Sequence, residues 1–110
     1  MPLSANARIE VYLPDLPRAA YQDLLTAYEH EFSYAFGGCS TVRGIEGHYL
    51  STNGTIIRDR INLVYTDTPF GLQEHSAALG QYADELRASA AEALEEEAIL
   101  VAVIGIHHAE

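Results

Sequence analysis

The chain has 110 residues, of which 48% are hydrophobic and 20% charged, and its formal net charge is −10. This composition is typical of a globular protein, and the length fits a single domain over residues 1–110. The acidic balance argues against nucleic acid as a partner, because the phosphate backbone would be repelled, and no apolar run reaches the ~20 residues that would make a membrane a partner.

The first third of the chain predicts a strand followed by a helix. Residues 7–13, "ARIEVYL", alternate between apolar and polar side chains, which is typical of a strand with one buried face. Pro14 is expected to end this strand, and Asp15 is suited to cap the next helix, with Pro17 in its first turn. Apolar residues then recur at helical spacing to about Phe36, where a Gly-Gly pair is expected to end the helix.

The middle of the chain, residues 42–67, predicts a β-hairpin. Asn53-Gly54 is the strongest turn signal in the sequence, and as a two-residue turn it would pair Thr52 with Thr55. Because side chains alternate along a strand, this register decides which residues of the hairpin share a face.

The last third predicts a helix over residues 76–96 and a final strand over residues 98–108, which is apolar on both faces. The resulting order, β-α-β-β-α-β, predicts a ferredoxin-like α+β fold. In that fold a four-stranded antiparallel sheet carries both helices on one face and leaves the other face open.

Period-two alternation sorts the side chains onto the two faces of the expected sheet. Facing the helices we expect a core of Ile9, Val11, Leu13, Ile57, Ile61, Leu63 and Tyr65. The open face would carry four of the six arginines, and its members are Arg8, Glu10, Tyr12, Arg43, Ile45, Tyr49, Arg58, Arg60, Asn62 and Val64.

Three interpretations of this open face remain. It is a solvated surface, an oligomer interface laced with Arg–Glu pairs, or a pocket for a small anion. The chain contains no lysine, so every fixed cation is a guanidinium, the group best suited to bidentate contacts with carboxylates and phosphates. The ligand-binding residues of such a pocket would be Arg43, Arg58, Arg60, Tyr12, Tyr49, Asn62 and Arg8. An apolar strip on the last strand favours a partner subunit, because the helices cover only one side of the sheet.

Candidate catalytic and metal-binding groups are few. With the two-residue turn, His48 lies opposite Asp59, which would suit a general base but is equally explained as a cross-strand polar pair. Glu10 is the one further carboxylate considered as an acid or base. His107 and His108, with His48, are candidate metal ligands, although adjacent strand residues point to opposite faces. No GxGxxG, Walker, GxSxG or HExxH motif is present, and the sequence leaves the identity of any cofactor unknown.

The cysteine count bears on location. Cys39 is the only cysteine, which excludes an internal disulfide, and the N-terminal residues lack the pattern of a signal peptide. We therefore expect a cytoplasmic protein.

From Cys39 to Thr68 the sequence resembles the PII-like and CutA-like superfamily. It has a Cys after the first helix, then "GHYLSTNG" where CutA-like proteins carry an aromatic strand ending in a Gly turn. "TIIRDRINLVYTDT" follows where those proteins carry a strand with an acidic residue and a closing Thr. The resemblance implies a compact homotrimer with its sheets turned inward and a small-ligand, metal or signalling role. A missing His-Pro-Tyr motif and a tight hairpin argue against copper binding and nucleotide signalling.

Three functions are therefore carried forward. The first is a small cytoplasmic oligomeric binding or regulatory module of the PII/CutA-like kind, which recognises a small anionic ligand or metal complex. The second is a small dimeric α/β-barrel-type enzyme, in which His48 or Glu10 moves a proton of an anionic substrate. The third is a structural, complex-forming protein without a ligand. The expected partner is a second copy of the chain, as a homotrimer first and a homodimer as the alternative.

Overall fold

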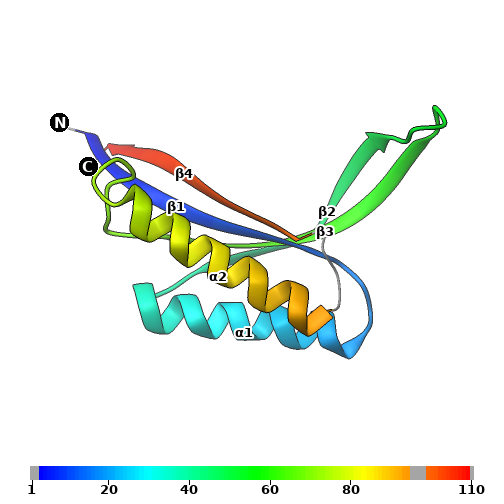
Figure 1. Cartoon of the computed structure of the whole chain (residues 1–110), viewed down its shortest axis with the longest axis horizontal. Helices are drawn as coiled ribbons and strands as arrows, with labels where there is room; N and C mark the ends of the chain where they lie inside the picture. Colours follow the sequence, from blue (N-terminus) through cyan, green and yellow to red (C-terminus); the bar gives the residue numbers. More distant parts are fainter. Residues whose placement is uncertain (1–2, 95–98, 110) are drawn as a thin grey trace.

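The structure, a computed structural model, describes residues 3–94 and 99–109, with side chains described for residues 6–94 and 99–107. Its elements follow the predicted order: β1 (Leu3–Pro14), α1 (Ala19–Phe36), β2 (Ser40–Leu50), β3 (Ile56–Asp67), α2 (Ser76–Leu94) and β4 (Leu100–Ala109). The strands form one antiparallel sheet in the order β2-β3-β1-β4, and both helices cover the same face (Figure 1). The ferredoxin-like α+β prediction is confirmed, while the predicted helix end at Glu96 lies outside the described residues.

The core lies between the helices and the central strand β1. Ile9, Val11 and Leu13 are almost completely buried there, as their alternation predicted, and they pack with Leu25 and Phe32 of α1. Gly37 adopts a positive φ of 89° and ends α1, a backbone conformation that residues with a side chain rarely adopt. No helix within residues 3–94 and 99–109 is long and apolar enough to cross a membrane.

The predicted hairpin register is wrong by one residue. Ser51 N–H donates to Thr55 O at 2.8 Å, so three residues rather than two separate the closing pair. Gly54 takes a left-handed conformation with φ 85°, as the last residue of a three-residue hairpin loop commonly does. The Thr55 N–H is also bonded to Ser51 Oγ and Asn53 Oδ1. These side-chain contacts favour the wider loop.

The slipped register inverts the predicted faces of β3. Asn62, Val64 and Thr66 are buried beneath the helices, where they pair with β1. The residues predicted to face the helices, Ile57, Ile61, Leu63 and Tyr65, belong to the other face. Leu63 and Tyr65 lie beside Tyr12 and Glu10 there. Arg58, Arg60 and Asn62 therefore do not share a face with Arg8, and the expectation that the arginines gather on the open face is wrong.

The outer part of the hairpin extends beyond the rest of the sheet. The last pair joining β1 to β3 is Pro14 with Ile61, so the strand partners of residues 45–60, the hairpin arm, all lie within the hairpin itself. The arm bends away from the helices (Figure 1), and it exposes Leu50 by 70% and Ile56 by 67% of their surface. A two-stranded ribbon of this kind is marginally stable by itself, and here its apolar side chains at the tip are largely uncovered.

Candidate functional site

A buried polar network joins the hairpin arm to the end of β1. Asn62 is 2% exposed, and its Oδ1 accepts a hydrogen bond from Gly44 N–H at 3.0 Å. Its Nδ2 donates to Asp15 Oδ1 at 3.2 Å, and the Asp15 N–H donates to Arg60 O at 2.8 Å. Asp15 therefore does not cap α1 as predicted: the helix N-cap is Arg18, which makes no side-chain capping bond.

Gly44 lies in a β-bulge, since the pairing of β2 with β3 shifts register between Val42 and Ile45. Its φ is +69°, and a Cβ placed there would come 2.7 Å from Arg60 Nη2. The guanidinium therefore passes directly over the glycine, and its Nε lies 3.6 Å from Asp15 Oδ2. The Asn62 network positions the backbone of Arg60, and the bulge at Gly44 makes room for its guanidinium.

A hollow of about 400 Å³ lies at this junction, on the side of the arm that faces the helices. We call it the arm-base hollow, and it is lined by Asp15, Leu16, Glu46, Arg58, Asp59 and Arg60. The volume is within the range of small-molecule sites. Four further hollows of 150–380 Å³ in the described part of the chain contain no arginine.

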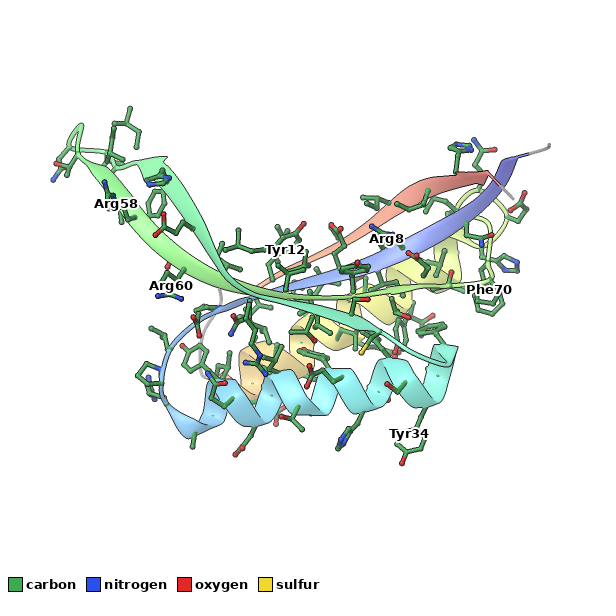
Figure 2. The ribbon with its side chains drawn as sticks, turned by 180° about the vertical axis from the view of Figure 1, so that it is seen from behind. Arg8, Tyr12, Tyr34, Arg58, Arg60 and Phe70 are labelled. Carbon is green, nitrogen blue, oxygen red and sulfur yellow. The ribbon has the colours of Figure 1, made fainter. Side chains whose placement is uncertain are left out.

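The charged groups of the arm-base hollow differ in how far they are already paired. Arg60 has Asp15 as an ion-pair partner, and Asp59 Oδ1 accepts the Arg60 N–H at 2.9 Å. The side chains of Arg58 and Glu46 make no hydrogen bond or ion pair among the described residues, and both are exposed. In Figure 2, Arg58 and Arg60 lie on one side of β3, whereas Arg8 and Tyr12 lie on the face of the sheet away from the helices.

The predicted pair of His48 and Asp59 does not form. His48 pairs with Arg58, and Asp59 pairs with Gly47, so the imidazole and the carboxylate lie on opposite faces of the arm. Glu10 has a different partner: it accepts a hydrogen bond from Tyr12 Oη at 2.7 Å. That bond, together with partial burial, raises the pKa of Tyr12.

Arg8 is fully engaged on the open face. Its Nε and Nη2 donate to the two carboxylate oxygens of Asp67 at 2.6 and 3.1 Å, and its guanidinium stacks on Tyr65 at 4.4 Å from the ring centre. The hydrogen bond to Asp67 raises the pKa of Arg8. Since Asp67 compensates the charge of Arg8 and occupies its Nε–Nη2 edge, Arg8 has little charge left to offer a ligand.

The remaining predicted residues are dispersed. Arg43 lies in the bulge and Tyr49 on the arm, both exposed and outside the arm-base hollow. His48 is on the arm, whereas His107 is near the end of β4 beside Ala5, and the side chain of His108 lies outside the described residues. Among the described residues no group of three or more His, Cys, Asp or Glu side chains could hold a metal ion.

Apart from the Arg8–Asp67 and Glu10–Tyr12 pairs, the open face is largely apolar. Leu100 and Ile104 of β4 are 58% and 38% exposed, whereas Val101 and Val103 pack against the core. Leu100 lies beside Tyr12, and Val42 continues the strip beyond Leu63. The apolar strip expected on the last strand is therefore present, on the side that the helices leave bare.

Sequence reasoning missed three residues of the arm-base hollow and its support. Asp15 was assigned to the helix start, Glu46 was not singled out, and Gly44 carried no turn signal. Gly44 follows Arg43 in the middle of a predicted strand, and an isolated glycine there is typical of a bulge. That was the one signal that could have located the distortion.

Three solved structures show what the fold resembles. CutA1 from Oryza sativa superimposes with a TM-score of 0.52 at 17% identity, covering 98% of this chain and 85% of that one. The apo form of a phage SAM lyase gives 0.56 at 18% identity, covering 97% and 86%. CPII, a nitrogen regulatory PII-like protein from Thiomonas intermedia K12 bound to ADP, AMP and bicarbonate, gives 0.49 at 15% identity, covering 99% and 100%.

Sequence comparison adds nothing to this likeness, because no protein-family model and no curated protein matches the chain. At identities of 17% and 18% over nearly the whole chain, the likeness shows the fold alone and assigns no ligand or reaction to this chain. The chain has a ferredoxin-like fold that is similar to the folds of CutA1, which its hairpin residues resemble, and of the phage SAM lyase.

Proposed function

We propose that this chain is a cytoplasmic binding module of the PII/CutA-like kind, which holds a small charged molecule in its arm-base hollow. The observation that carries the proposal is Arg58, an exposed guanidinium in a concave site without a partner among the described residues. Arg60 is held beside it by Gly44 and Asp15. Preorganised guanidinium groups bind carboxylates and phosphates well because little side-chain freedom is lost.

The module also self-associates through the open face of its sheet, and the partner is a second copy of the chain. At a net charge of −10 two copies repel each other over most of their surface. On the open face, however, Arg8 is neutralised by Asp67, and Glu10 is bonded to the Tyr12 hydroxyl. The exposed Leu100 and Ile104 beside them are apolar. This is where like-charged copies can approach at the lowest electrostatic cost. A homotrimer is the first assembly to test and a homodimer the alternative.

Covering the open face leaves the ligand site accessible. Arg58 and Arg60 belong to the opposite side of the arm, which faces the helices rather than the proposed interface. Ligand binding and assembly can therefore be tested separately, by substitutions on different faces of one sheet.

The binding proposal is tested by thermal shift and calorimetry with phosphate, carboxylates, adenine nucleotides and S-adenosylmethionine. A ligand at 100 times its dissociation constant would stabilise the protein by ~2.7 kcal/mol. Arg58→Ala should weaken the binding of any such ligand ~10- to 100-fold, as expected for loss of a charged hydrogen bond. Arg87→Ala is the matched control, since Arg87 is an exposed arginine of α2 outside the hollow.

The result that overturns the proposal is a ligand whose affinity is unchanged by Arg58→Ala, or the absence of any binding ligand. In the second case the structural, complex-forming alternative becomes the better account. Turnover of a bound ligand would instead revive the enzyme alternative, although the His48–Asp59 pair would have no part in it.

A further inference from the structure

The arm-base hollow does not have the charge of a simple anion site. Two guanidinium groups, Arg58 and Arg60, share it with the carboxylates of Asp15 and Glu46. Asp59 also lines the hollow, but alternation along β3 places its carboxylate on the other face of the arm. A phosphate or dicarboxylate placed against the arginines would also face the carboxylates of Asp15 and Glu46. The repulsion acts over short distances, within the range where salt does not fully screen exposed charges.

Pairing within the hollow reduces the number of charged groups that are free to bind a ligand. Asp15 and Arg60 largely compensate each other, and Asp59 is bonded to a backbone N–H. The two groups left over carry opposite charges: Arg58 is one unpaired cation and Glu46 one unpaired anion. The free charge of the hollow is therefore a dipole rather than a positive patch.

The spacing of these two groups follows from the strand register. Glu46 pairs directly with Arg60, so Arg58 is its diagonal neighbour on the same face of the arm. Diagonal neighbours lie ~7–8 Å apart along the backbone, and both side chains are long enough to contact one small molecule lying between them. Leu16 supplies the apolar wall of the hollow.

We infer that the ligand is a small zwitterion of the amino-acid type, whose carboxylate binds Arg58 and whose ammonium group binds Glu46. This inference rests on the proposed function, because it names the class of ligand for the same hollow. Arg60 lies opposite Glu46, and its ion pair with Asp15 leaves Arg58 as the free cation for the carboxylate. A ligand with only one of the two charges leaves either Arg58 or Glu46 without a partner and loses that contact.

The test uses ¹⁵N-labelled full-length protein titrated with individual free L-amino acids at millimolar concentrations. For the amino acid that binds best, the N-acetyl derivative and the amide are then titrated, because they retain only the negative or only the positive charge. The backbone and Arg Nε–H signals of the hollow should shift with the free amino acid. Both derivatives should bind at least 10-fold more weakly.

Two substitutions locate the charges. Arg58→Ala should abolish the preference for the free amino acid over its amide, and Glu46→Gln should abolish the preference over the N-acetyl derivative. Glu92→Gln is the matched control, because Glu92 is an exposed carboxylate of α2. It should leave all affinities unchanged.

Two outcomes overturn the inference and can be told apart. If the N-acetyl derivative or phosphate binds as well as any free amino acid, the hollow is an anion site, and the proposed function stands without the zwitterion. If neither amino acids nor anions shift any signal of the hollow, both the inference and the proposed function are wrong.

Discussion

Replacing Asn62 with alanine should separate the support of the ligand site from the general stability of the fold. The substitution removes the acceptor of the Gly44 N–H and the donor to Asp15. Asp15 is partly exposed and can bond water instead, so the main loss is the partly buried Gly44 N–H left without its acceptor, at ~1–3 kcal/mol. With an unfolding entropy of about 2.1 cal/mol/K per residue, each kcal/mol corresponds to ~4 °C, so the melting temperature should fall by ~8 °C.

Val64→Ala is the matched control for this experiment. Val64 is fully buried two residues further along the same face of β3, and losing its methyl groups should cost a similar ~2 kcal/mol through packing alone. The assay is hydrogen exchange of the Gly44 amide together with urea unfolding. In Asn62→Ala this amide should exchange far faster than the loss of global stability explains, while in Val64→Ala it should follow global stability. Equal protection of Gly44 in both variants would refute the role given to Asn62.

Three further predictions test other parts of the structure. Leu100→Glu, on the open face, should shift the protein toward monomer in light scattering. Tyr34→Glu should not, because this side chain is 90% exposed on the outer side of α1 (Figure 2). Equal assembly of both variants would exclude the open face as the interface. Burial raises the pKa of Tyr28 from 10.0 to about 12, so the folded state favours the neutral phenol. Its contribution to the free energy of unfolding is complete below pH 10 and is lost as the pH rises through 12. Tyr28→Phe should flatten that part of a plot of urea midpoint against pH, and an unchanged plot would contradict this. Gly44→Ala should cost ~1–2 kcal/mol through its positive φ and should displace the guanidinium of Arg60; chemical shifts of the Arg60 Nε–H identical to wild type would argue against that contact.

The order of elements could be predicted from the sequence because each element depends on local signals. The alternation over residues 7–13 and the Gly pair after α1 report directly on the backbone conformation at those positions. The helix-facing residues of β1 were correct for the same reason, since only one of its two faces is apolar.

The register of the hairpin could not be predicted from Asn53-Gly54 alone. That dipeptide fits both a two-residue turn and a three-residue loop with Gly54 in the left-handed region. The choice depends on hydrogen bonds that the Thr55 N–H donates to Ser51 Oγ and Asn53 Oδ1, which only the folded loop reveals. One residue of slip then moved Arg58 and Arg60 to the opposite face.

The faces of β3 were ambiguous for a second reason. In "INLVYT", residues 61–66, both alternating sets contain apolar side chains, so period-two alternation does not say which set is buried. The structure buries Asn62, Val64 and Thr66 and leaves Leu63 and Tyr65 on the open face. A buried asparagine is stable there because Gly44 and Asp15 form hydrogen bonds with its side-chain amide. The bond to Gly44 requires a bulge, which the alternation of side chains does not predict.

The central claim, that the arm-base hollow is the ligand site, is tested most directly by a crystal structure of the protein purified with its native small molecules retained. The account predicts electron density for a small molecule in the hollow, in contact with Arg58 and Glu46, and a second copy of the chain on the open face. Density for a ligand beside Arg8 and Tyr12 on the open face, with the hollow filled only by solvent, would contradict it.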